Sequence, residues 1–282
     1  MNIMLQARRS VGLALGAGAA RGWAHIGVIE RLAEHGIAPC AVAGASIGAL
    51  VGGSYAAGKL DALKRFALSL TRRRMYSLLD ISWRGSGLFA GEKLGILLES
   101  ELAGCTFADL QVPFICIATE LSTGHEMWLR SGLVAPAIRA SYALPGIFKP
   151  VKVNGHWLID GSVVNPIPVS ACRALGARLV IAVNLGPESM SGIVMQDPPV
   201  LPDADNVGMA PALTSILIAA FNITQDRFSR SRLAGDPPDI NMTLRTSGLS
   251  LFDFAKAEEA IDAGRDAVDK MMPEIERALA FA

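Results

Sequence analysis

The 282-residue sequence has only four cysteines, and they stand apart without the paired spacing of a metal site or a redox motif. We therefore expect no metal centre and interpret Cys40, Cys105, Cys116 and Cys172 as structural thiols. Histidine is equally scarce, with four in the chain, so few general bases are available. No apolar run reaches the roughly 20 residues that a transmembrane helix requires.

An excess of charge is missing as well, because 26 lysines and arginines balance 26 aspartates and glutamates. Without a basic stripe, the chain is not expected to bind nucleic acid. Hydrophobic residues, in contrast, make up 51% of the chain, which predicts a globular protein with a large core. Arg8 and Arg9 precede an apolar segment, as in a signal peptide. Because that segment also fits a strand and a turn, we expect a cytoplasmic protein. The alternative is a cytoplasmic protein that also binds peripherally to the inner face of the membrane.

Apolar runs typical of buried strands alternate with segments typical of helices. Continuous apolar strands predict a mostly parallel central sheet covered on both faces, which is a three-layer α/β/α fold. The pair Asn154-Gly155, between two alternating runs, adds a β-hairpin over residues 151–160. Strands are expected at residues 11–15, 37–44, 113–121, 178–185 and 238–244, and helices up to residue 35 and at 47–57, 60–70, 92–102, 134–142, 165–177 and 254–281.

No internal repeat or domain boundary is visible, so residues 1–282 are expected to form a single domain. It would contain a mobile loop at about residues 187–211 and a C-terminal helical segment at about residues 212–282. The helix after the loop is apolar nearly all round, which is typical of a buried helix. A lipid-facing lid and the interface of a homo-oligomer are the alternatives. A basic stretch at residues 72–91, with Trp83, is expected to touch a membrane transiently or to be a solvated loop.

Ser46 lies in the stretch AGASIGAL, between a strand-like run and a helical segment. Gly44 and Gly48 complete the GxSxG pattern of a nucleophile elbow, where a sharp turn exposes a serine at the end of a strand. Such a strained turn needs small neighbours, and the N-terminus of the following helix stabilises negative charge. Ser46 is therefore a candidate nucleophile, and the alternative is a serine that only caps the helix.

An earlier strand, turn and helix are predicted in LALGAGAARGWAHIGVI. Its turn directs several backbone N–H groups to one point, which suits a dinucleotide pyrophosphate or an oxyanion. Arg21 stands where the dinucleotide fingerprint has a glycine, and the second strand ends without the acidic residue, so nucleotide binding is a poor fit. Adjacent turns of a parallel sheet open at one edge. We therefore expect the N–H groups near Gly18 and Ala19 to face Ser46 as an oxyanion hole.

The residue that accepts the proton of Ser46 is not obvious, because no histidine has a strong claim. The histidines are His25, His35, His125 and His156. Asp160 ends the second strand of the hairpin and is followed by Gly161, so a rigid strand delivers a carboxylate into a turn. An ordinary Asx turn is the alternative interpretation. A triad in α/β-hydrolase order needs a histidine after the acid, and none follows Asp160.

Five stretches together resemble the patatin-like phospholipase family, and in particular its small bacterial RssA-like branch. They are LALGAGAARGWAHIGVI, VAGASIGALVG, IRASYALPGIF, WLIDGSVVNPIPVS and AGDPPDI. The resemblance implies a patatin-like fold, a catalytic dyad of Ser46 and Asp160, and hydrolysis of a lipid or acyl ester with no metal or organic cofactor. It also implies an oxyanion hole from the glycine-rich turn. The residues that match it are Gly18, Ala19, Arg21 and Gly22.

The chain departs from the family pattern at two places. Ala17 and Ala19 stand where glycines are usual, so an oxyanion hole requires that neither position needs a positive φ. Ser162 follows Asp160-Gly161 where glycine or alanine is usual. Its hydroxyl is expected to lower the basicity of the Asp160 carboxylate.

We therefore expect a carboxylic ester hydrolase of phospholipase, lysophospholipase or esterase type, in which Asp160 takes the proton of Ser46 directly. The alternative is a catalytically weak or inactive regulator that binds a lipid or a protein partner on the same fold. Arg21 is expected to cap its turn by binding carbonyl groups, with a lipid phosphate as the other possibility. By the resemblance, Arg139 is expected to brace the site.

Overall fold

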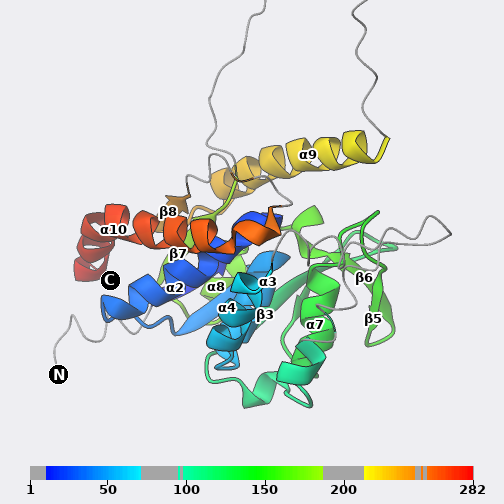
Figure 1. The fold of residues 1–282 in the computed structure, drawn as a ribbon, viewed down its shortest axis with the longest axis horizontal. Coiled ribbons are helices and arrows are strands. Elements are labelled where there is room, and N and C mark those ends of the chain that lie inside the picture. Colours follow the sequence, from blue (N-terminus) through cyan, green and yellow to red (C-terminus); the bar gives the residue numbers. More distant parts are fainter. Residues whose placement is uncertain are drawn as a thin grey trace, which may run out of the picture.

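A computed structural model of the chain describes residues 11–70, 95, 98–186, 213–244, 249 and 253–281. Its centre is an eight-stranded sheet in the order β5-β6-β3-β2-β1-β7-β8, with β4 also paired to β3 (Figure 1). The strands are β1 (Val11–Leu15), β2 (Ala41–Ala45), β3 (Phe114–Glu120), β4 (Glu126–Leu129), β5 (Val151–Val153), β6 (His156–Asp160), β7 (Leu179–Asn184) and β8 (Ile240–Thr243).

Five neighbouring strands, β3, β2, β1, β7 and β8, run parallel, whereas β4, β6 and β5 are antiparallel additions. The longer helices are α2 (Ala24–Glu34), α3 (Ile47–Ala56), α4 (Leu60–Leu68), α7 (Val134–Ser141), α8 (Val169–Ala174), α9 (Leu213–Gly235) and α10 (Ala257–Phe281). Short 3₁₀ turns include η1 (Ala19–Trp23), η3 (Gly161–Val163) and η5 (Phe254–Lys256).

Two hydrophobic layers sandwich the sheet, which confirms the predicted α/β fold with a mostly parallel central sheet. Leu13 and Leu15 of β1 belong to the layer that contains α2, α3, α4, α7 and α10. Ala14 points to the opposite layer, which contains α8. Because successive side chains of a strand point to opposite faces, a strand covered on both sides must be apolar throughout. This explains why β1, β2 and residues 114–118 of β3 are continuous apolar runs in the sequence.

Both edges of β3 are occupied, and this arrangement places the ends of two other strands together. At one edge β4 pairs with residues 116–119 of β3. At the other edge β2 pairs with residues 114–117, and β6 pairs with residues 118–120. Since a strand has only two edges, β6 must continue along β3 from the point where β2 stops. The C-terminal ends of β2 and β6 therefore meet.

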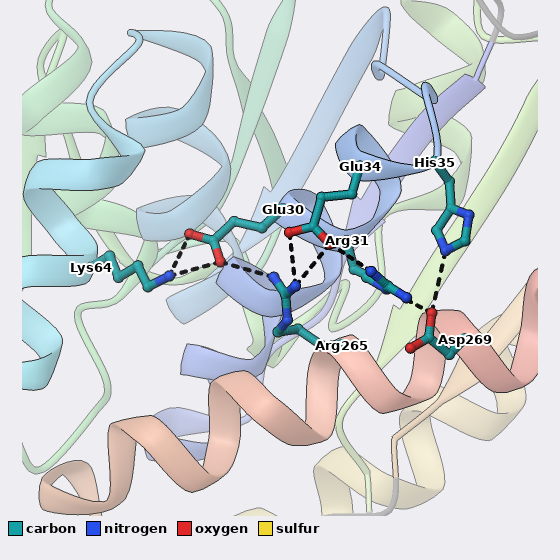
Figure 2. A network of polar contacts seen from close by, with 7 residues as sticks. All are labelled: Glu30, Arg31, Glu34, His35, Lys64, Arg265 and Asp269. Carbon is teal, nitrogen blue, oxygen red and sulfur yellow. Dashed lines mark hydrogen bonds and ion pairs between the residues drawn. The ribbon is translucent and has the colours of Figure 1, made fainter.

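The C-terminal helix α10 lies along α2 (Figure 1) and approaches it closely through two glycines. A Cβ atom on Gly27 would lie 1.9 Å from the Ile261 carbonyl oxygen, and one on Gly264 would lie 2.0 Å from that of Ala24. A network of ion pairs links α2, α4 and α10 at the surface (Figure 2), where Arg265 binds Glu34 and Lys64 binds Glu30. The glycines set the distance between α2 and α10, because a side chain at either position would collide with the other helix. The ion pairs at the surface add little to the stability of this packing.

The predicted strands and helices that lie among the described residues are present, with shifts of a few residues at their ends. The strand expected at residues 37–44 is shorter, at Ala41–Ala45. In the hairpin turn, Asn154 and Gly155 both have positive φ, 49° and 88°, as a type I′ turn requires. The predicted loops at residues 72–91 and 187–211 lie outside the described residues.

The expectation that the helix after residue 211 is buried is wrong for the α9 side chains that the structure describes. Ile223 is 63% exposed and Phe228 is 37% exposed, whereas Ser229 is buried. The helix lies across the top of the molecule in Figure 1, at the margin of the layers that sandwich the sheet, and its Leu233 packs against the layer that contains α8. No helix within the described ranges has both the length and the hydropathy needed to cross a membrane.

Candidate active site

Ser46 occupies a sharp turn between β2 and α3, with φ 57° and ψ −124°. A non-glycine residue rarely adopts this conformation, and it persists only where its surroundings impose it. Two close backbone contacts do so. A Cβ atom on Gly44 would lie 2.4 Å from the Gly48 carbonyl oxygen, and one on Gly48 would lie 2.1 Å from that of Leu15. Both glycines of the GxSxG pattern are thus required by the packing of the turn.

The hydroxyl of Ser46 donates a hydrogen bond of 2.7 Å from Oγ to Oδ2 of Asp160. The other carboxylate oxygen, Oδ1, accepts from the backbone N–H of Ser162 at 2.8 Å and from its Oγ at 2.7 Å. Asp160 is buried. The structure therefore brings together the serine and the acid that the sequence suggested, and the hydroxyl of Ser162 contacts the acid as expected.

Burial dominates the protonation of Asp160, because a carboxylate loses its hydration when it is removed from water. It raises the pKa of Asp160 from 3.8 to about 6, against the opposing effects of the hydrogen bonds from Ser162 and Ser46. This pKa makes the carboxylate a stronger base than an exposed aspartate while leaving it mostly ionised at neutral pH.

The backbone on either side of Asp160 is also fixed. Its N–H donates to the Ala143 carbonyl at 3.0 Å, and its carbonyl accepts from the Thr119 hydroxyl at 2.8 Å. The next residue, Gly161, passes so close to β3 that a Cβ atom would lie 2.1 Å from the Ile117 carbonyl oxygen. A glycine is therefore required directly after the acid.

The glycine-rich turn after β1 lies against the start of α3. A Cβ atom on Gly22 would lie 2.2 Å from the side chain of Ile47, the residue after Ser46. The Ala17 N–H donates to the Pro166 carbonyl at 3.0 Å. Within the described residues, the N–H groups of Gly18 and Ala19 have no hydrogen-bond acceptor. Among the described residues these two donors are therefore available to a ligand.

Ala19 adopts a positive φ of 50°, whereas Ala17 does not. The condition stated above for an oxyanion hole, that neither alanine needs a positive φ, is therefore met at Ala17 but not at Ala19. The left-handed conformation costs a residue with a Cβ atom about 1 kcal/mol, so the turn is kept with some strain. The backbone N–H of Ala19 is retained all the same.

The two arginines of the sequence prediction have different surroundings. Arg21 is half-buried, and its buried Nε atom has no hydrogen-bond partner in the described part of the chain. Burial lowers the pKa of Arg21, and nearby Asp226 of α9 acts in the opposite direction. Arg139 forms an ion pair with Glu99.

Each histidine is engaged elsewhere or exposed. His25 is buried and its Nε2 lies 2.8 Å from the Gly16 carbonyl oxygen. Burial lowers its pKa to about 4, so its ring is neutral at physiological pH. His35 lies near Asp269 at the surface (Figure 2), and His125 and His156 are exposed.

Ser141 of α7 is a site residue that the sequence analysis missed. Its Oγ accepts a hydrogen bond of 3.0 Å from the backbone N–H of Ser46, and the side chain is fully buried. The stretch IRASYALPGIF contains it, but its partner lies 95 residues away. In the described ranges, no group of three or more His, Cys, Asp or Glu side chains could hold a metal ion.

Comparisons with known proteins give a match to a family profile and several similar proteins. The profile of the family described as patatin-like phospholipase matches residues 13–173. An uncharacterised NTE family protein of Mycobacterium tuberculosis is 42% identical over 175 residues, which cover 62% of this chain and 49% of that protein. A protein named lysophospholipase NTE1 from Saccharomyces cerevisiae is 32% identical over 184 residues, covering 63% of this chain and 11% of that protein.

The fold has a counterpart among solved structures, namely VipD from Legionella pneumophila. The TM-score is 0.50 at 14% identity, and the match covers 94% of this chain and 67% of that one. At this identity the likeness concerns the fold alone. The chain spans about half the length of the mycobacterial relative.

Proposed function

This chain belongs to the patatin-like phospholipase family, and we propose that it is a serine acyl hydrolase that acts on lipid esters. The observation that carries the proposal is the 2.7 Å hydrogen bond from Ser46 Oγ to a buried carboxylate oxygen of Asp160. A hydroxyl and a base within hydrogen-bonding reach are the first requirement of nucleophilic catalysis. The name of the yeast relative, a lysophospholipase, agrees with a lipid ester as substrate.

The first step is attack of Ser46 Oγ on the ester carbonyl carbon. The new C–O bond forms as the hydroxyl proton moves to Asp160 Oδ2, and the carbonyl π electrons move to the carbonyl oxygen. A pKa of about 6 suits Asp160 to this role, since a general base works best when its pKa is near the ambient pH. The bonds from Ser162 keep the carboxylate aimed at the serine while Asp160 is protonated.

The negative charge on the carbonyl oxygen needs donors that are already in place. The N–H groups of Gly18 and Ala19 have no acceptor among the described residues, and their turn contacts the residue after Ser46 through Gly22. We assign them as the donors of the oxyanion hole. Loss of one such donor typically costs about 3 kcal/mol of transition-state stabilisation.

The cycle closes with two further proton transfers through the same carboxyl group. Asp160 gives its proton to the leaving alcohol oxygen as the tetrahedral intermediate collapses, and an acyl-Ser46 ester is left. A water molecule then attacks the acyl carbon and gives its proton to Asp160, which passes it back to Ser46 Oγ. The fatty acid is released and both side chains return to their initial states.

A second candidate function, a weak or inactive regulator that binds a lipid or a protein partner, is favoured by one observation. Ala19 holds a strained left-handed conformation where a glycine would be relaxed, and it carries one of the assigned oxyanion donors. A protein under no selection for turnover could keep such a turn. Cytoplasmic location, a single domain over residues 1–282 and a homo-oligomer stay predictions from the sequence.

Hydrolysis of a panel of p-nitrophenyl esters and phospholipids separates these functions. The hydrolase is expected to release fatty acid from at least one lipid ester, and Ser46→Ala is expected to abolish the release. Lipid binding by a folded protein without any release, in both wild type and Ser46→Ala, would support the regulator instead.

A further inference from the structure

Glu126, on β4, accepts hydrogen bonds from three different parts of the protein. Its Oε1 accepts from Trp128 Nε1 and from Asn165 Nδ2, both at 2.7 Å. Its Oε2 accepts from Arg232 Nη2 at 2.6 Å. Asn165 belongs to the segment that follows Asp160, and Arg232 belongs to α9. One carboxylate thus joins β4, the segment from Asp160 to Asn165 (the acid segment) and the helix α9.

Arg232 also binds the acid segment directly. Its Nε and Nη2 donate to the Val164 carbonyl oxygen at 3.2 Å and 3.0 Å. The ring of Phe228, one turn earlier on α9, lies 5.7 Å from the guanidinium carbon. The guanidinium therefore bridges a side chain of β4 and a backbone carbonyl of the acid segment, a planar geometry that lysine cannot reproduce.

The segment from Asp160 to Asn165 is a compact unit, so a restraint on its end is passed to its beginning. The N–H groups of Val164 and Asn165 both donate to the Gly161 carbonyl, at 3.2 Å and 2.9 Å. Asp160 caps the turn by accepting from Ser162. Asp160 is held from the other side by Thr119, which pairs with Glu126 across β3 and β4.

We propose that Glu126 and Arg232 are positioning residues that dock α9 on the Asp160–Asn165 turn and thereby hold the Asp160 carboxylate against Ser46. The proposal rests on the proposed function, because it assigns these residues to the same dyad. Arg232 lies beyond residue 173, where the match to the family profile ends. A helix outside the matched region therefore completes the site. Displacement of a reacting group by about 1 Å can lower a rate by about 100-fold.

The test compares Arg232→Met, Arg232→Lys, Glu126→Gln and the double variant Glu126→Gln with Arg232→Met. Arg227→Met is the matched control, since Arg227 is an exposed arginine on the same helix. Two measurements are made on each folded variant: kcat and KM for a soluble p-nitrophenyl ester, and hydrogen exchange of the amides of residues 161–165. Thermal denaturation shows which variants are folded.

Arg232→Met is expected to lower kcat about tenfold or more with little change in KM, and to speed amide exchange in residues 161–165. Arg232→Lys is expected to keep part of the rate, because one donor can still reach Glu126. The double variant is expected to match the worse single variant, since both changes break one interaction. Arg227→Met is expected to behave as wild type.

The result that overturns the proposal is unchanged kcat and unchanged exchange in folded Arg232→Met, or an equal loss in Arg227→Met. If Arg232→Met does not fold, the same two measurements are read from Arg232→Lys and Glu126→Gln, and unchanged kcat and unchanged exchange in both would overturn the proposal. Failure of the proposed function looks different: wild type then shows no turnover. In that case faster exchange in Arg232→Met alone still supports the docking, and unchanged exchange still contradicts it.

Discussion

Ser46 and Asp160 meet end to end along one edge of β3, although 114 residues separate them in the sequence. β2 pairs with β3 as far as Ala45 and Ile117, and β6 begins to pair where Asp160 lies opposite Ala118. The serine follows the last residue of one strand, and the acid is the last residue of the other. Their contact is thus a consequence of strand register, and a rigid sheet supports both side chains.

The pH dependence of ester hydrolysis reports the ionisation of Asp160, because only the carboxylate can accept the proton of Ser46. Burial raises its pKa to about 6. We expect kcat/KM for a soluble ester to rise about tenfold per pH unit below pH 6 and to level off above it. A plateau that extends unchanged to pH 4 would contradict this assignment.

Ser162→Ala is expected to move the rising limb of that profile to higher pH. The hydroxyl of Ser162 donates to Asp160 Oδ1 at 2.7 Å and lowers the pKa of Asp160. Without this donor the carboxylate is less stabilised, so its pKa rises further. If the rising part of the pH profile stays in place or moves to lower pH, the hydroxyl of Ser162 does not lower the pKa of Asp160.

The same group makes folding stability depend on pH. In the folded state the pKa of Asp160 is raised above its unfolded value of 3.8, so the unfolded chain loses this proton first. The raised pKa of Asp160 therefore stabilises the folded state below about pH 4, and this stabilisation is lost as the pH rises through about 6. Asp160→Asn, which stays neutral, is therefore expected to be more stable than wild type at pH 7, by up to about 3 kcal/mol. Urea denaturation of both proteins at pH 4 and pH 7 measures this difference, and an equal difference at both would contradict it.

Ala19→Gly is expected to stabilise the protein by about 1 kcal/mol, because glycine adopts the φ of 50° without a Cβ clash. Ala17→Gly is the matched control two residues earlier, where φ is not positive. There a glycine only adds flexibility to the unfolded chain, so stability should fall by about 0.5 kcal/mol. Chemical denaturation distinguishes the two, and equal shifts for both variants would contradict the assigned strain.

Ser141→Ala leaves the backbone N–H of Ser46 without its acceptor in a partly buried turn. An unsatisfied buried donor costs about 1–3 kcal/mol, so the variant is expected to unfold at lower urea concentration and to turn over ester more slowly. Ser170→Ala, on α8, is a control in which no change is expected. Wild-type stability and rate in Ser141→Ala would exclude a role for this contact.

The sequence was informative where one local pattern implies one local structure. The GxSxG turn, the Asn154-Gly155 hairpin and the apolar strands are each set by neighbouring residues, so their places could be predicted. Asp160 was an ambiguous turn residue by itself, and only the family resemblance paired it with Ser46.

Contacts between distant elements could not be predicted in this way. The bond from Ser46 to Ser141 and the ion pair of Arg232 with Glu126 join residues about 100 positions apart, and no periodicity encodes them. The exposure of α9 was missed for a related reason. The composition of α9 is typical of a buried helix. Whether a helix is buried, however, depends on which other elements pack against it, and the sequence of the helix does not specify them.

The central claim is that Asp160 alone accepts the proton of Ser46, and mass spectrometry of covalent labelling tests it most directly. Wild type treated with a fluorophosphonate is expected to gain one adduct, located on Ser46, with a rate that rises with pH through about 6. Asp160→Asn, folded by circular dichroism, is expected to label at least about 100 times more slowly and without that pH dependence. Labelling of Asp160→Asn at the wild-type rate, or an adduct on a residue other than Ser46, would contradict the account.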